Sequence, residues 1–234
     1  FFAKLRAMRW SSILLAAALA ACSRSAPTGS SAGKALFTQA GCASCHKIGS
    51  VCSAVGPDLT LLGFRHSAAW LELWLKNPGA WKPDTLMPNT RLPEPALKAL
   101  VDYLAGLQGQ DWPKGERPWD AISLKDPVAR GRVIYARAGC VGCHGIAGTG
   151  GFPNPHAKGG MVPAVNKTAE AYSKTELIAK IRKGVNSPQP EDPKGPAPMI
   201  RMPAWREKLD DSELDAVASY LLTLPPPKND KSDW

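Results

Sequence analysis

The chain has 234 residues, with 22 prolines, 21 glycines and a formal net charge of +9. Three of the cations belong to the first ten residues, and without them the charge is +6, which is not the strongly basic balance of a nucleic-acid-binding protein. Abundant Pro and Gly and a low content of strand-forming residues argue against an extended sheet. The length allows one or two domains.

Residues 1–21 have the pattern of an export signal. Three cations without an acid are followed by an apolar stretch too short to span a bilayer. The stretch ends in Leu-Ala-Ala-Cys22, which resembles the bacterial lipobox, so we expect residues 22–31 to form a lipidated tether. An ordinary signal peptide with an incidental Cys22 is the alternative. The chain opens with Phe1, so translation starts either at Met8 or upstream.

Two copies of the pattern Cys-x-x-Cys-His account for four of the six cysteines and two of the four histidines. The residues of these copies are Cys42, Cys45 and His46, and Cys140, Cys143 and His144. Residues three apart share one face of a helical turn, so both thiols of a copy can add to the two vinyl groups of one porphyrin. The histidine that follows can then ligate the iron. This is the c-type haem attachment signal, and we expect two covalently bound haem c groups, each with one iron.

Paired cysteines also occur as redox dithiols and as halves of zinc sites, but neither use requires the adjoining histidine. A four-ligand zinc centre built from both copies is a further alternative. Because c-type haems are attached outside the cytoplasmic membrane in bacteria, the two copies agree with the export signal. We therefore expect the protein on the periplasmic side of a bacterial membrane, anchored through Cys22.

Each attachment motif lies inside a longer repeat. Gly33 and Phe37 precede the first motif at the same distances at which Gly131 and Tyr135 precede the second. A helical apolar stripe then closes each repeat. The stripe residues are Leu97, Leu100, Val101, Leu104 and Leu107 in the first repeat, and Leu214, Val217, Ala218, Leu221 and Leu222 in the second. Each repeat predicts an N-terminal helix, the motif, a loop with short helices, and a closing amphipathic helix.

The repeats divide the chain into two domains, 32–107 and 127–224, each near the lower size limit for an independent core. A porphyrin adds apolar surface and two covalent links, so we expect either half to be poorly folded without haem. Residues 108–126 contain prolines and no sustained apolar period, which predicts a linker that wraps a surface. Its Trp112 and Trp119 are expected to pack against a domain.

Each repeat resembles a class I cytochrome c domain, so the chain resembles a dihaem class I cytochrome c lipoprotein. The resemblance covers about residues 32–107 and 127–224, and its motifs are specific for haem rather than for a pathway. It implies an all-α fold of two tandem domains, each wrapped around one covalent haem, in which a Gly/aromatic pair of the first helix crosses the last helix. It also implies that a downstream methionine binds the second axial position of the iron.

In the first domain, Met87 is the only methionine available for this role, and it lies in a Pro-rich stretch that suits a stiff loop. We therefore predict His46 and Met87 as the iron ligands. Pro57 matches the family's proline on the histidine side, whose carbonyl commonly receives the imidazole N–H. His66 is the rival ligand, but it precedes an apolar helical stretch and fits a helix-start residue.

In the second domain, Met199 and Met202 compete for the axial position. Met202 is followed by proline, as is the methionine of the first domain, so we predict His144 and Met202 as the iron ligands. Met161 and His156 lie in or beside a Gly/Pro-rich insertion and are further rivals.

The proline on the histidine side is less regular between the repeats. Pro57 lies 11 residues after His46, whereas Pro163, which we expect to take the same part, lies 19 residues after His144. Trp205 fits a core or haem-wall aromatic.

An iron held between imidazole and thioether passes single electrons and does not readily bind peroxide or oxygen. We therefore expect an electron-transfer protein rather than an enzyme, acting as a carrier or as the electron-entry subunit of a respiratory or photosynthetic complex. Its expected partners are redox proteins or a membrane redox complex, with small and salt-sensitive contacts, and not nucleic acid. The alternative is a dihaem peroxidase or sulfur-compound oxidase, which needs an open or unusually ligated iron.

Cys52 is left over once Cys22 and the four motif cysteines are assigned. A buried apolar side chain near the first haem and a reactive thiol are its two interpretations. Residues 225–234 are typical of a polar tail. The sequence leaves the donor, the acceptor and the oligomeric state open.

Overall fold

The computed structural model describes residues 29–49, 55–112 and 115–226, and within these ranges every regular element is a helix. The first repeat contains α1 (Gly29–Gln39), the 3₁₀ turn η1 (Cys42–Ser44), α2 (Leu62–Arg65), α3 (Ala68–Lys76), α4 (Pro78–Trp81) and α5 (Glu94–Ala105). The second contains α6 (Pro127–Arg137), α7 (Val141–His144), α8 (Thr168–Ala171), α9 (Lys174–Lys183), the 3₁₀ turn η2 (Trp205–Glu207) and α10 (Asp211–Leu221). The all-α class is therefore confirmed. The predicted leftover Cys52 and the lipidated Cys22 lie outside the described residues.

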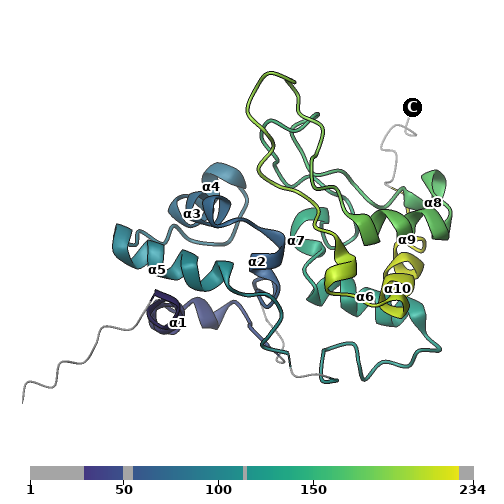
Figure 1. Cartoon of the computed structure of the whole chain (residues 1–234), viewed down its shortest axis with the longest axis horizontal. Coiled ribbons are helices and arrows are strands. Elements are labelled where there is room, and N and C mark those ends of the chain that lie inside the picture. Colours follow the sequence, from purple (N-terminus) through teal and green to yellow (C-terminus); the bar gives the residue numbers. More distant parts are fainter. Residues whose placement is uncertain (1–28, 50–54, 113–114, 227–234) are drawn as a thin grey trace, which may run out of the picture.

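Figure 1 shows the two repeats as neighbouring helical bodies, with α1 to α5 on one side and α6 to α10 on the other. In the first body, α1 packs across α5 at Gly33. A Cβ atom on Gly33 would lie 2.1 Å from the carbonyl oxygen of Ala99, so only glycine permits this crossing. The ring of Phe37 lies 6.1 Å from that of Tyr103 beside it, as the Gly/aromatic pattern predicted.

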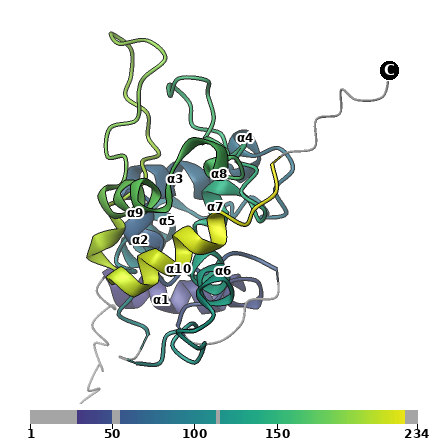
Figure 2. The same cartoon turned by 90° about the vertical axis from the view of Figure 1, so that its right-hand side faces the viewer.

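The second body repeats this crossing with α6 and α10, which lie across one another in Figure 2. A Cβ atom on Gly131 would lie 1.9 Å from the carbonyl oxygen of Ala216. The rings of Tyr135 and Tyr220 are 5.4 Å apart. The same pair of residue types therefore joins the first and last helices in both halves.

Helix α1 begins earlier than expected. It starts at Gly29, inside the segment 22–31 that the sequence assigned to the tether.

The two bodies share parts of their cores. Leu61 and Phe64 of the first repeat pack in the core of the second, and Phe64 meets Trp205 edge to face at 5.3 Å. Val162 and Ile200 of the second repeat pack in the core of the first. Trp205 is therefore a core aromatic, as expected, and it also joins the two bodies.

Two loops of the second body, 149–166 and 184–204, extend to the same side in Figure 1. They pair through an isolated bridge between Ala157 and Pro190 and through the bond from the N–H of Glu191 to the carbonyl of His156. The first body has no counterpart among its described residues, because its equivalent loops are short.

The described part of the linker 108–126 contains no helix and lies on the folded bodies. Trp112 donates from Nε1 to the carbonyl of Gly49, and the fully buried Trp119 donates to Glu213, so both tryptophans pack as predicted. None of the helices in the described ranges has the length and apolarity needed to cross a membrane.

Candidate haem-binding sites

The first Cys-x-x-Cys-His motif lies on and just after η1. Gly41, in the left-handed region at φ 76°, redirects the chain from α1 into this turn. The carbonyl of Cys42 accepts hydrogen bonds from the N–H groups of Cys45 at 3.2 Å and His46 at 2.9 Å. The turn therefore holds the two thiols at the three-residue spacing that one porphyrin requires.

The imidazole of His46 is held by a backbone carbonyl. Its Nδ1 lies 3.0 Å from the oxygen of Pro57, so Nδ1–H donates to this oxygen and Nε2 remains available for a metal. A Cβ atom on Gly56 would lie 2.5 Å from the ring, so the glycine leaves room for the imidazole. The predicted histidine–proline bond is thus confirmed in the first half.

The second motif lies on α7 and ends with the same arrangement. Nδ1 of His144 is 3.0 Å from the oxygen of Pro163, in spite of the longer sequence separation. Burial lowers the pKa of His144, so its imidazole is neutral and able to bind a metal. Tyr135 fixes the end of the helix, because its hydroxyl donates to the carbonyl of Gly145 at 2.8 Å.

Three of the four motif thiols are partly buried, those of Cys42, Cys140 and Cys143, and Cys45 is exposed. Burial raises the pKa of Cys140 to about 12, and it also raises the pKa of Cys42 and Cys143. Redox dithiols and zinc ligands instead need a stabilised thiolate. In the described ranges, no three His, Cys, Asp or Glu side chains form a metal-binding group. The feature that favours haem attachment over the dithiol and zinc alternatives is the adjoining histidine, which in both motifs is bonded through Nδ1 to a proline carbonyl.

Met87 lies half-buried against the core of the first body, on the loop that follows α4. Its sulfur is 3.0 Å from Nε1 of Trp74, which donates to it. The N–H of Met87 donates to Oγ1 of Thr85 at 3.2 Å. The methionine is held on an ordered loop, and its binding to iron stays a prediction.

The rival ligand His66 ends α2 and precedes Ser67, the N-cap of α3. Its ring stacks on Trp70 at 3.9 Å, and burial lowers its pKa to about 3. It lies at the junction of two helices, one residue before the N-cap of α3, whereas the sequence predicted His66 itself as the helix-start residue.

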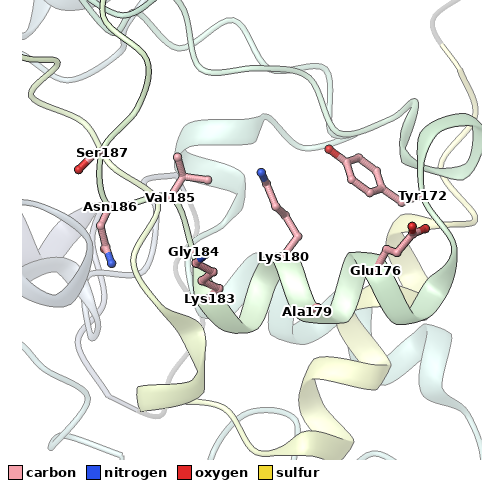
Figure 3. Close-up of a pocket in the computed structure, with 9 residues that line it drawn as sticks. All are labelled: Tyr172, Glu176, Ala179, Lys180, Lys183, Gly184, Val185, Asn186 and Ser187. Atoms are coloured by element: carbon pink, nitrogen blue, oxygen red, sulfur yellow. The ribbon is translucent and has the colours of Figure 1, made fainter.

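Met202 packs against the core of the second body, as does Cys140. Its backbone forms a two-bond bridge with Val185, at 2.8 and 3.2 Å. A pocket of about 560 Å³ lies beside this bridge along α9, with Tyr172 and Lys180 among its lining residues (Figure 3).

The rivals of Met202 lie elsewhere. Met199 packs against the core of the first body. Met161 is 50% exposed, and His156 is exposed on the loop 149–166 with φ 68°. The packing favours Met202, and its role as iron ligand also stays a prediction.

The residues of each half fit a c-type haem. Each half offers two thiols on one turn, an imidazole whose Nδ1 is bonded to a carbonyl, and a half-buried methionine on an ordered loop. These features define a small helical haem-binding domain that occurs twice in the chain.

The cytochrome c family model matches residues 30–108 and 128–225, so the chain belongs to the cytochrome c family. With the helical architecture, this makes the protein two tandem class I cytochrome c domains. The family binds haem c covalently, and its domains support electron transfer.

Part of the chain is similar to cytochrome c oxidase subunit 2 of Alkalihalophilus pseudofirmus. The two are 31% identical over 85 residues, which are 32% of this chain and 25% of that protein. The chain therefore spans about a quarter of the length of this relative.

Sequence reasoning missed the polar contact between the two motifs. Arg65 reaches the segment before the second motif, and Arg137 pairs with Asp58 beside the first. The only available signal was a charged residue inside the apolar run 61–66, which the helical pattern did not explain.

Proposed function

We propose that the protein is a dihaem c-type cytochrome that transfers single electrons on the periplasmic side of a bacterial membrane, anchored by a lipid on Cys22. The observation that carries the proposal is the pair of equal histidine–proline bonds. In both halves Nδ1 of the motif histidine lies 3.0 Å from a proline oxygen, which leaves Nε2 free to bind iron. Two such sites imply two haems.

The bound haem supplies a one-electron ferric/ferrous couple. His46 and Met87 hold the first iron in the proposed arrangement, and His144 and Met202 hold the second. The proline carbonyls fix each imidazole and raise its basicity. Met87 and Met202 would supply thioether ligands to the irons, which would favour the ferrous state, raise the potentials and keep peroxide and oxygen away from the metal.

We further propose a redox protein or a membrane redox complex as the partner. The similarity to a protein named cytochrome c oxidase subunit 2 supports electron entry into a respiratory complex. The last turn of α9 carries Lys180, Arg182 and Lys183, and Figure 3 shows Lys180 extending from this helix. These cations would attract an acidic surface on a redox partner. The association rate of the two proteins should therefore fall as the salt concentration rises.

The main test combines a haem count with a spectroelectrochemical titration. Two haems per chain are expected, both low-spin, with a sulfur-to-iron absorption band in the ferric protein. Met87→His and Met202→His should each lower one potential and remove part of that band. Met161→Leu is the control, because its half-exposed side chain lies on the outer loop, and it should change neither signal.

A five-coordinate high-spin signal in the resting protein would contradict electron carriage for that half and favour an enzyme. The anchor is tested separately with Cys22→Ser, which should abolish partition of the exported protein into a detergent phase.

A further inference from the structure

Arg65, at the end of α2 in the first domain, reaches into the second haem-binding motif. Its Nη1 donates to the carbonyl of Gly139 at 3.1 Å, directly before Cys140. A Cβ atom on Gly139 would lie 2.4 Å from the guanidinium carbon, and one on Gly142 would lie 3.3 Å from Nη1. Glycine at both positions lets the guanidinium lie against the motif backbone. The side chain is therefore part of the wall of the second site.

The charge of Arg65 is buried and only weakly compensated. The residue is 6% exposed, and its two hydrogen bonds go to neutral carbonyls, those of Gly139 and Asp58. Its Nε is buried without a hydrogen-bond partner among the described residues. A charge in such surroundings acts strongly on its neighbours, because little solvent screens it.

Asp58 and Arg137 complete a small cluster between the domains. Nη2 of Arg137 lies 2.8 Å from Oδ2 of Asp58 and donates to the carbonyl of Gly49 at 3.1 Å. Oδ1 of Asp58 accepts from the N–H of Thr60 at 2.8 Å. The carboxylate of Asp58 pairs with Arg137, whereas Arg65 bonds to the backbone carbonyl of Asp58. Among these three groups, two positive charges stand against one negative charge.

A short chain of hydrogen bonds through this cluster connects the two haem-binding motifs. His46 bonds to the carbonyl of Pro57, the next carbonyl is that of Asp58, and Nη2 of Arg65 donates to it at 3.1 Å. Nη1 of the same guanidinium then bonds to Gly139 at the second motif. The position of the guanidinium is therefore set by the histidine side of the first site.

We propose that Arg65 is a positioning and charge-supplying residue of the second haem site, contributed by the first domain, and that it raises the reduction potential of that site. Uptake of one electron lowers the charge of the site by one, so a nearby buried cation stabilises the reduced form relative to the oxidised form. The inference rests on the proposed function, because it needs a haem in the second site.

The test measures both potentials in the full-length holoprotein, with Met202→His used to assign the second haem. Arg65→Gln should lower the second potential by at least the equivalent of a tenfold change in the redox equilibrium, about 59 mV for one electron. Arg65→Lys keeps the charge and should restore most of the loss. Arg132→Gln removes the same charge from the exposed face of α6 and is the matched control.

A second variant keeps the proposal testable if Arg65→Gln fails to load haem. Asp58→Asn keeps an acceptor for Thr60 but removes the opposing charge, so the second potential should rise. Unchanged second potentials in the loaded variants would overturn the inference, and so would equal losses in Arg65→Gln and Arg65→Lys. The haem count and spin state of the unmodified protein report on the proposed function independently of these shifts.

Discussion

The two haem-binding domains reach the same local geometry through loops of different length. The motif histidine is separated from its proline acceptor by 11 residues in the first domain and by 19 in the second, yet Nδ1 lies 3.0 Å from the oxygen in both. The extra residues of the second domain lie in the loop 149–166, which extends outward. Loop extension costs little when the ends stay fixed, so the bond rather than the spacing is what the domain maintains.

The domains differ more in how their closing helices are held. Helix α5 starts at Glu94, and its N-cap residue Pro93 provides no side-chain cap. Helix α10 starts with a capping box formed by Asp210 and Glu213, and Glu213 also binds the linker. Its carboxylate forms an ion pair with Arg117 and accepts from Nε1 of Trp119 at 2.6 Å. The second domain therefore depends on a buried charge where the first depends on apolar packing.

The largest expected effect comes from removing that charge. Glu213→Ala should destabilise the second domain by about 3–5 kcal/mol, because it leaves the buried Arg130 without its ion-pair partner and leaves Arg117 with Asp120 alone. It also removes the N3 half of the capping box of α10. Amide hydrogen exchange in the holoprotein should show faster exchange in α6 and α10 but not in α1 and α5.

Asp211→Ala is the control for this variant, since its exposed carboxylate begins the same helix. Equal exchange in both domains after Glu213→Ala would mean that the domains unfold as one unit and that the contrast between them has no energetic consequence.

The next effect should be shared by both domains. Gly33→Ala and Gly131→Ala each force a methyl group against a backbone carbonyl and should cost about 3 kcal/mol, the upper end for overpacking. Denaturant unfolding of each variant measures the cost. Gly79→Ala, in α4, is the control, because its added Cβ would meet only Oδ1 of Asn77, at 3.7 Å. A much smaller loss in one domain would show that its helices can move apart.

The sequence predicted the structural features that recur in both repeats at a regular spacing. The paired motifs, the Gly/aromatic crossings at Gly33 and Gly131 and the burial of Trp119 all follow from local pattern and composition. The contacts of Arg65 and Asp58 with the second domain did not follow, because they join residues more than 70 positions apart. Their partners are a backbone carbonyl and a charge on another helix, and neither leaves a periodic signal in the sequence.

The smallest effect concerns the dependence of the first domain's stability on pH. Burial lowers the pKa of His66 to about 3 from its ordinary value of 6.5, so the folded first domain keeps this ring neutral while the unfolded chain protonates it. The stability from this group is complete above pH 6.5 and falls by about 1.4 kcal/mol per pH unit as the pH drops towards 3. At pH 5 the loss amounts to about 2 kcal/mol.

His66→Phe keeps a ring on Trp70 without a titrating group, so unfolding free energies at pH 7 and pH 5 should differ less in this variant than in the parent. His156→Asn, on the exposed loop of the second domain, should leave the difference unchanged. If His66→Phe loses as much stability as the parent between these pH values, the acid sensitivity of the first domain belongs to other groups.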